Sequence, residues 1–172
     1  MKLFIASDVH GSAYYCRLML EKFEESGADY LVLLGDVLYH GPRNDLPRDY
    51  APKQVIAMLT PYAARIIAVR GNCDTEVDQM VLPFPMLQER GLIADGEHRI
   101  YLIHGHKELD ALADLLVEGD VLLYGHTHVP ADFRGKGGCR ILNPGSVSIP
   151  KENSGHAYLI YEGGEFTRGE LD

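Results

Sequence analysis

Short runs of apolar residues recur along the chain, separated by polar segments. They are rich in Leu, Ile, Val and Tyr, and continuous runs of this length are typical of strands buried on both faces of a sheet. Five runs stand out, at residues 3–6, 30–34, 66–69, 100–103 and 121–124.

Helical patterns lie between some of these runs. Ser12 can cap a helix over residues 13–26 that stops at Gly27, and Pro52 suits the first turn of a second helix. A third helix is expected over residues 107–118. Alternating strands and helices indicate an α/β fold.

The C-terminal half has a different pattern. Segments 131–134 and 139–142 flank a glycine-rich turn, and segments 157–161 and 165–168 flank Gly-Gly. Each pair predicts a β-hairpin, so we expect a mixed sheet with an antiparallel part. The length of 172 residues suits a single domain, residues 1–172.

Polar side chains follow the apolar runs. In an open α/β sheet, ligands bind outside the carboxyl ends of the strands, so these side chains should meet at one edge. Two pairs are spaced two residues apart, which in extended backbone points both members the same way. The candidates are Asp8 and His10, Asp36, Asn72, His104 and His106, and His126 and His128.

These residue types suit metal binding. Carboxylate, amide and imidazole groups bind divalent ions, and two Asp, one Asn and four His could hold two ions about 3.5–4 Å apart. An ordinary turn would explain one D-x-H motif, and a hydrogen-bonded core residue would explain a lone histidine. Five segments with the same property favour a metal centre over these readings.

Charge and composition narrow the function further. The chain has 16 basic and 25 acidic side chains and a net charge of −9, which argues against long nucleic acid as a partner. A small phosphorylated substrate remains compatible, because bound metal reverses the local field. No apolar stretch reaches the roughly 18 residues of a membrane span.

Cysteine usage indicates the compartment. Cys16, Cys73 and Cys139 form an odd set without a C-x-x-C pair, and the N-terminus has no signal pattern. A reducing compartment is the default for such a chain, so we expect a cytoplasmic protein.

The motifs D-V-H, G-D-V, G-N-C-D, H-G-H and G-H-T-H occur in this order. They resemble the calcineurin-like metallophosphoesterases, whose pattern is D-x-H, G-D, G-N-H-[DE], H and G-H-x-H. The longer segments G-D-V-L-Y-H-G-P-R-N and N-P-G-S-V-S-I-P-K are similar to bacterial YfcE-type phosphodiesterases. The resemblance implies a β-sandwich of two mixed sheets flanked by helices, with two metal ions at one edge.

The resemblance also implies roles for residues. Two ions carry a formal charge of +4, of which two aspartates remove 2, and the remainder suits a phosphate anion. A bridging water, ionised to hydroxide, is the expected in-line nucleophile. Mn²⁺ is the expected metal, with Fe, Zn or Ni as alternatives. Asp8, His10 and His128 would hold one ion, Asn72, His104 and His126 the other, and Asp36 both.

Other residues are candidates for substrate binding. His40 and Arg43 follow Asp36 in a Gly-Pro loop, where the guanidinium could fork onto phosphate oxygens or simply be solvated. His106 could contact substrate, support a metal ligand, or be an exposed turn residue. Residues 143–146, Asn-Pro-Gly-Ser, predict a turn.

Cys73 stands where most members of the resembled family carry histidine. A protonated thiol is uncharged and donates weakly, so it cannot offer a cation to a dianionic phosphomonoester. A phosphodiester has one negative charge fewer and needs less positive charge at this position. Asn72 and Cys73 are therefore the catalytic candidates, with Cys73 as a weak general acid, as a space-filling residue or, less compatibly with the other ligands, as a metal ligand. Asp74 would support the ligands or cap a helix.

The predicted activity is that of a hydrolase, a manganese-dependent phosphodiesterase acting on small phosphate esters. A phosphomonoesterase would suit histidine at position 73 better. A scaffold of the same fold, such as a retromer subunit, would lose part of the ligand set, whereas all seven positions are filled here. The natural substrate and the oligomeric state, including a homo-oligomer, stay open.

Overall fold

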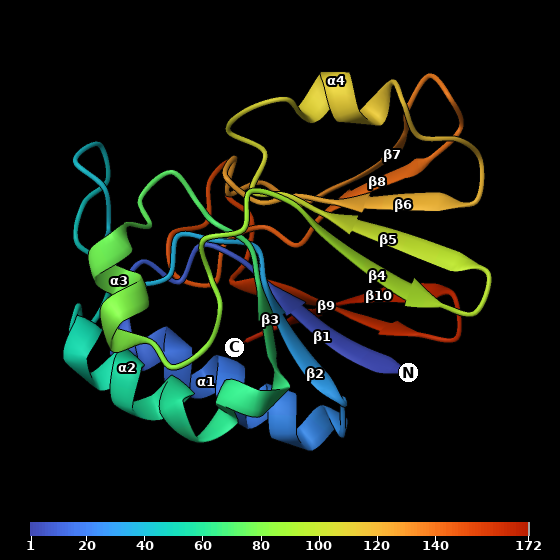
Figure 1. Ribbon diagram of the computed structural model, residues 1–172. Helices are drawn as coiled ribbons and strands as arrows, with labels where there is room; N and C mark the ends of the chain where they lie inside the picture. The colour runs from blue at the N-terminus through green and yellow to red at the C-terminus, as the bar shows by residue number, and fades with distance from the viewer. Residues whose placement is uncertain (172) are drawn as a thin grey trace.

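Two five-stranded sheets form the centre of the molecule in the computed structural model, which describes residues 1–171 (Figure 1). The first sheet has the order β10-β9-β1-β2-β3. Its inner strands β1, β2 and β3 are parallel, and β9 and β10 add antiparallel at one edge. The strands are β1 (Lys2–Ala6), β2 (Tyr30–Leu33), β3 (Ile66–Ala68), β9 (Ala157–Glu162) and β10 (Glu165–Glu170).

The second sheet has the order β4-β5-β6-β8-β7. Strands β5, β6 and β8 are parallel, and β4 and β7 pair antiparallel at the two edges. The predicted β-sandwich of two mixed sheets is therefore confirmed. The strands are β4 (Gly91–Asp95), β5 (His98–Leu102), β6 (Asp120–Leu123), β7 (Ala131–Arg134) and β8 (Arg140–Asn143).

Helices cover the outer faces of both sheets (Figure 1). Helices α1 (Ala13–Ser26) and α2 (Pro52–Leu59) pack on the first sheet, and α4 (Leu109–Ala113) packs on the second. A 3₁₀ helix, η1 (Thr60–Arg65), follows α2. Helix α3 (Glu76–Val81) comes after the loop that leaves β3. Among residues 1–171, none of the helices combines the length and the apolar character needed to cross a membrane.

The side chains of the continuous apolar runs pack into two different hydrophobic cores. In β1, Leu3 and Ile5 face the core between the sheets, while Phe4 and Ala6 face the core beneath α1 and α2. Side chains alternate across a strand, so a strand covered on both faces needs apolar residues at every position. This packing fixes the strand ends from which the polar residues extend.

The third predicted helix is wrong in its extent. Instead of spanning residues 107–118, α4 contains only Leu109–Ala113. Glu108 has a left-handed backbone (φ 58°) that separates Lys107 from the helix. After the helix, the N–H of Leu116 bonds to the carbonyl of Ala113, a turn geometry that delivers Leu116 to the core.

The sequence pattern also missed β4 and α3 as elements. Strand β4 pairs with β5 across the turn at Gly96, where φ is 62°. The dipeptide Asp95-Gly96 is a hairpin signal that could have found this pair.

Candidate metal centre and active site

The loops that leave five strands bring the polar residues together at one edge of the sandwich (Figure 1). Parallel strands present their carboxyl ends on the same side, which is why distant segments converge here. The loop after β1 carries Asp8 and His10, that after β2 carries Asp36, that after β3 carries Asn72, that after β5 carries His104, and that after β6 carries His126 and His128.

The backbone of this region is unusual. The φ angles are 59° at Asp8, 49° at His10, 55° at Asp36, 65° at His126 and 62° at His128. The expectation that the D-x-H and H-x-H pairs are extended is therefore wrong. A left-handed non-glycine residue costs about 1–3 kcal/mol and persists where its surroundings fix it, commonly at a functional site.

Asp8, His10 and His128 form the first group of donors. The two Nε2 atoms of His10 and His128 are 3.2 Å apart, and Oδ1 of Asp8 lies 3.5 and 3.2 Å from them. Nδ1 of His10 donates to the Tyr39 carbonyl at 2.7 Å, and Nδ1 of His128 donates to the Ile149 carbonyl at 2.6 Å. Both rings therefore turn their Nε2 lone pairs toward Asp8.

Asp36, His104 and Asn72 form the second group. Nε2 of His104 lies 3.4 Å from Oδ2 of Asp36 and 3.1 Å from Oδ1 of Asn72. Nδ1 of His104 donates to the Leu34 carbonyl at 2.7 Å, which again directs Nε2 inward. Oδ2 of Asp36 is also 3.7 Å from Nε2 of His10, so this carboxylate lies between the two groups.

The donor set fits divalent cations. Oδ1 of Asp8 is buried and has no hydrogen-bond partner within residues 1–171. Burial raises the pKa of Asp8, but His10 and His128 outweigh it and hold the carboxyl well below its usual range. Burial lowers the pKa of His104, but its bond to Asp36, the negative charges of Asp8 and Asp36 and the bond to the Leu34 carbonyl together outweigh burial and raise the pKa to about 9. Carboxylates and lone pairs aimed at common points are the arrangement that a cation requires.

His126 completes the cluster in a half-buried position. Its ring centroid lies 5.2 Å from that of His104 and 6.0 Å from that of His106. Burial, followed by the charge of His104, lowers the pKa of His126 and favours the neutral ring. Its backbone N–H donates to Oδ2 of Asp8 at 3.1 Å.

Asp74 joins the loops after β2 and β3. Its Oδ2 accepts from the backbone N–H groups of Asp36 at 2.8 Å and Gly71 at 2.7 Å, and its Oδ1 accepts from Val37 at 2.9 Å. The side chain is buried, so these three bonds fix the left-handed Asp36 against the second loop.

The predicted turn at residues 143–146 has a supporting role that the sequence did not reveal. The hydroxyls of Ser146 and Ser148 both donate to the carbonyl of Asp8, at 2.9 and 3.1 Å. Nδ2 of Asn143 donates to the Gly125 carbonyl at 2.8 Å. These bonds hold the loops after β1 and β6 together.

Two glycines are required by close approach. A Cβ at Gly71 would collide with Oδ1 of Asp36, and one at Gly125 would collide with Oγ of Ser7. The loops can therefore pack against each other only without side chains at these positions.

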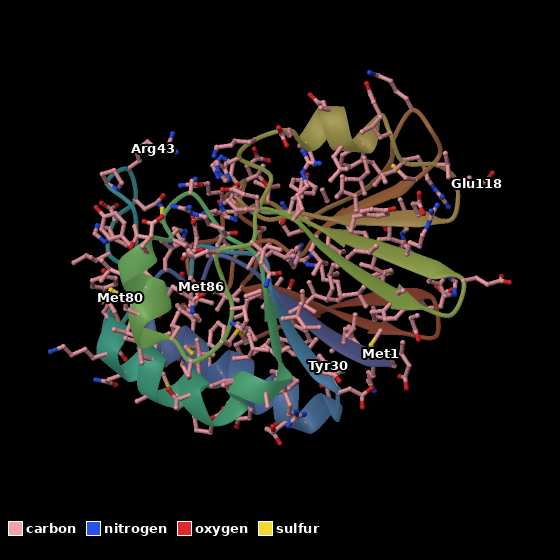
Figure 2. The ribbon with its side chains drawn as sticks, in the orientation of Figure 1. Met1, Tyr30, Arg43, Met80, Met86 and Glu118 are labelled. Atoms are coloured by element: carbon pink, nitrogen blue, oxygen red, sulfur yellow. The ribbon has the colours of Figure 1, made fainter. Side chains whose placement is uncertain are left out.

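A cavity of about 670 Å³ lies beside the donors; we call it the catalytic cavity. Arg43 lines it from a projecting loop (Figure 2), and Lys151, for which the sequence predicted no role, lines it as well. It therefore contains cationic side chains next to the cluster. Its walls are Asp36, Tyr39, Gly41, Pro42, Arg43, Asn44, Asn72, Cys73, Thr75, His126, Thr127, His128 and Lys151.

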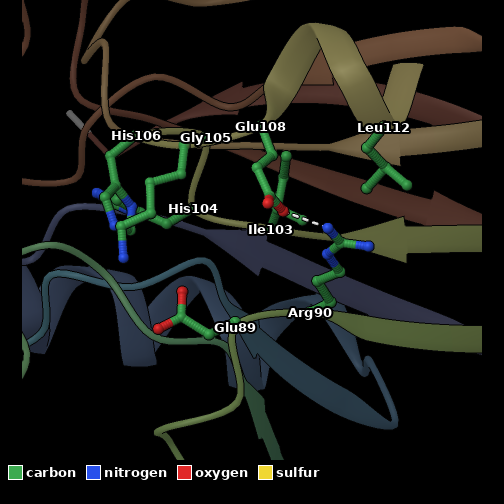
Figure 3. Close-up of a pocket in the computed structure, with 9 residues that line it drawn as sticks. Glu89, Arg90, Ile103, His104, Gly105, His106, Glu108 and Leu112 are labelled. Carbon is green, nitrogen blue, oxygen red and sulfur yellow. Dashed lines mark hydrogen bonds and ion pairs between the residues drawn. The ribbon is translucent and has the colours of Figure 1, made fainter. Parts of the chain in front are cut away.

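The two other substrate-binding candidates lie elsewhere. The ring of His40 packs edge-on against Tyr39 and Tyr50, with centroids 4.8 and 5.1 Å away. His106 lines a separate pocket of about 200 Å³ (Figure 3). The ion pair of Arg90 and Glu108 lines the same pocket, at the side away from His104 and His106.

Cys73 sits directly at the donor cluster. Its backbone N–H donates to Oδ1 of Asp36 at 2.7 Å, and its Sγ accepts from Nδ2 of Asn72 at 3.2 Å. Burial, followed by the negative charge of Asp36, raises the pKa of the thiol. The side chain is therefore a neutral thiol at pH 7.

The fold and the donor cluster together define a class of metallohydrolase. The chain belongs to the calcineurin-like phosphoesterase superfamily, whose sequence profile it matches over residues 1–164. It is 50% identical over 159 residues to phosphodiesterase YfcE of Escherichia coli K12, covering 92% of this chain and 85% of YfcE. The solved structure of the E. coli phosphoesterase YfcE superposes with a TM-score of 0.91 at 45% identity, covering 100% of this chain and 94% of that one.

More distant relatives share the fold. The probable metallophosphoesterase YsnB of Bacillus subtilis is 26% identical over 171 residues, covering 93% of this chain and 83% of YsnB. Vacuolar Protein Sorting 29 from Cryptosporidium parvum has a TM-score of 0.63 at 17% identity, covering 98% of this chain and 95% of that one. The second likeness shows the fold alone.

Proposed function

We propose that this protein is a metal-dependent phosphodiesterase that hydrolyses small phosphodiesters. The observation that carries the proposal is the convergence of Asp8, Asp36 and the inward-facing histidine Nε2 atoms beside a cavity with cationic walls. The 50% identity to a named phosphodiesterase supports the choice of ester.

The proposed metal ligands follow the two groups of donors. When bound, two divalent cations neutralise phosphate charge and lower the pKa of a water molecule. Mn²⁺ is our proposed metal, because mixed carboxylate and imidazole sites suit it, and Fe, Zn and Ni are the alternatives. Asp8, His10 and His128 would hold one cation, Asn72, His104 and His126 would hold the other, and Asp36, which lies between the two groups, would serve both.

The protein's own groups hold this arrangement and position the substrate. The carbonyls of Tyr39, Leu34 and Ile149 keep the protons on Nδ1 of three histidines, so that Nε2 stays free for a cation. Arg43 and Lys151, which line the catalytic cavity, would attract phosphate oxygens.

Cys73 accounts for the preference for diesters. A neutral thiol beside Asp36 gives no positive charge to a dianionic monoester, and its raised pKa makes it a poor proton donor. A singly charged diester needs less stabilisation at this position. The proposal therefore places diesters above monoesters.

We also propose the cytoplasm as its location, because Cys16, Cys73 and Cys139 are all free thiols. A non-catalytic scaffold is the alternative that the likeness to Vacuolar Protein Sorting 29 raises. The filled donor set of this chain favours an enzyme instead.

A test compares one phenol in two esters. The protein is stripped with chelator, reloaded with Mn²⁺, Fe²⁺, Zn²⁺ or Ni²⁺, and assayed with bis(p-nitrophenyl) phosphate and p-nitrophenyl phosphate. We expect no turnover without metal, recovery with Mn²⁺, and a higher kcat/KM for the diester. Full activity in metal-free protein would overturn the metal dependence, and a higher kcat/KM for the monoester would overturn the ester class.

A further inference from the structure

A second hollow of about 410 Å³ lies between the loop after β2 and the helices α2 and α3. Among the described residues that line it, Asp78 is the single charged one, and its carboxylate accepts from the N–H and hydroxyl of Thr75 at 2.7 and 3.1 Å. We call this hollow the side groove. Its main walls are Tyr39, Tyr50, Ile56, Cys73, Val77 and Val81.

The side groove adjoins the catalytic cavity. Tyr39, Cys73 and Thr75 line both hollows. The Sγ of Cys73 lies within 4.8 Å of donor atoms of both His10 and Asp36. A group attached to a phosphorus atom at the donor cluster can therefore pass Cys73 and enter the side groove.

The two hollows differ in charge. The catalytic cavity contains Arg43 and Lys151, whereas the side groove offers two tyrosine rings and aliphatic side chains. In diester hydrolysis, water oxygen bonds to phosphorus and the bond from phosphorus to the leaving oxygen breaks. The leaving oxygen takes the electron pair and then a proton, so it favours the cationic side. The other ester oxygen keeps its bond and gains no charge.

We propose that the side groove binds the retained organic arm of the phosphodiester, so that the preferred substrates have an aromatic or similarly apolar retained arm. This inference rests on the proposed phosphodiesterase function. The groove has the size and the apolar, aromatic lining of small-molecule sites. Burying a phenyl ring against Tyr39, Val77 and Val81 removes apolar surface from water, which a methyl arm does to a much smaller extent.

The test keeps the leaving group constant. Methyl p-nitrophenyl phosphate and phenyl p-nitrophenyl phosphate are assayed with the Mn²⁺-loaded protein, and each kcat/KM is divided by the uncatalysed rate. We expect a preference of about tenfold for the phenyl ester. Val77→Asn and Val81→Asn should each lower the phenyl value by about three- to tenfold and change the methyl value less than twofold.

Met80 provides a matched control. It lies on α3 with Val77 and Val81, is 82% exposed on the outer side of the helix (Figure 2), and does not line the side groove. Met80→Asn should leave both esters unchanged. Thermal unfolding and metal content of each variant show whether a loss reflects the groove or the fold.

A binding measurement gives an independent readout. The retained arm stays on the monoester product, so phenyl phosphate should bind the Mn²⁺-loaded protein more tightly than methyl phosphate by calorimetry, and the difference should shrink in the groove variants. Equal values for both arms, or an unchanged preference in folded Val77→Asn and Val81→Asn, overturn the groove while leaving the phosphodiesterase intact. Absence of turnover with either diester overturns the proposed function, and this inference with it.

Discussion

Asp74 offers a sharp test of how the loops support the donor cluster. Its carboxylate accepts three backbone N–H groups at 2.7–2.9 Å, one of them from Asp36. Burial raises the pKa of Asp74 to about 6, against the effect of these N–H groups, so the carboxylate is ionised at pH 8. The Asp74→Asn substitution keeps the shape of the side chain but replaces one carboxylate oxygen with an amide NH₂ group. This NH₂ group is a hydrogen-bond donor, and it would face a backbone N–H, which is also a donor.

The size of the effect follows from these bonds. At least one buried N–H loses its partner, at about 1–3 kcal/mol, and the remaining bonds lose their charge assistance, at about 0.5–1 kcal/mol each. The neutral asparagine no longer buries the negative charge of Asp74, and this offsets part of the lost stability. We expect a loss of about 2 kcal/mol at pH 8, which lowers Tm by about 4–8 °C for a chain of this size.

The substitution should also weaken metal binding. Asp36 keeps its left-handed backbone through the Asp74 bond, so we expect Mn²⁺ affinity to fall by about 10- to 100-fold. Urea unfolding measures stability, calorimetry measures Mn²⁺ binding, and diester turnover measures activity. Asp114→Asn is the control, because that carboxylate is exposed and pairs only with Lys136 in the structure, so it should change stability by less than about 0.5 kcal/mol. Wild-type stability and Mn²⁺ affinity in Asp74→Asn would refute this reasoning.

Three further predictions concern the cluster itself. Asp36→Ala should lower kcat for the diester by at least about 100-fold while circular dichroism stays unchanged, and near-normal turnover with two bound metals would show that Asp36 is not the bridge. Cys73→His should raise the monoester-to-diester activity ratio by about ten- to a hundredfold, because an imidazolium can bond to a dianion, and an unchanged ratio in correctly metallated protein would locate ester preference elsewhere. In chelated protein, the pKa of His104 is raised from its ordinary value of 6.5 to about 9, so its contribution to stability is fully present below pH 6.5 and is lost as pH rises through 9. Urea unfolding should show this fall in stability with rising pH, and the fall should be smaller in the His104→Gln variant.

Much of the fold was accessible from the sequence because its signals are local. A strand buried on both faces requires an unbroken apolar run, and Ser12 and Gly27 mark the ends of α1 through their own backbone geometry. Helix α4 was predicted too long because the apolar pattern continues through Leu116. Packing of Leu116 into the outer core occurs through a turn, which periodicity cannot distinguish from a helix.

The sequence predicted that these candidate residues would converge at one edge of the fold, but it did not reveal the residues that support them. Asp8 and His128 carry chemistry that a motif reveals, but their left-handed backbones depend on loops that are far apart in the sequence. Ser146 reaches the Asp8 carbonyl across 138 positions, and Lys151 lines the catalytic cavity from the end of the segment N-P-G-S-V-S-I-P-K, in which the sequence predicted only a turn. Such residues have no local signal because their partners are defined only by the assembled fold.

The bonds from Ser146 and Ser148 to Asp8 have a consequence for how the protein is made. Strand β1 is synthesised well before its partner β9, and the two hydroxyls that hold Asp8 follow it by 138 and 140 positions. At about 5–20 residues per second, the nascent chain carries Asp8 for roughly 7–30 seconds before Ser146 and Ser148 are synthesised. Metal loading at the first group of donors therefore waits for His128, and a ribosome stalled before that residue displays only two of that group's three donors.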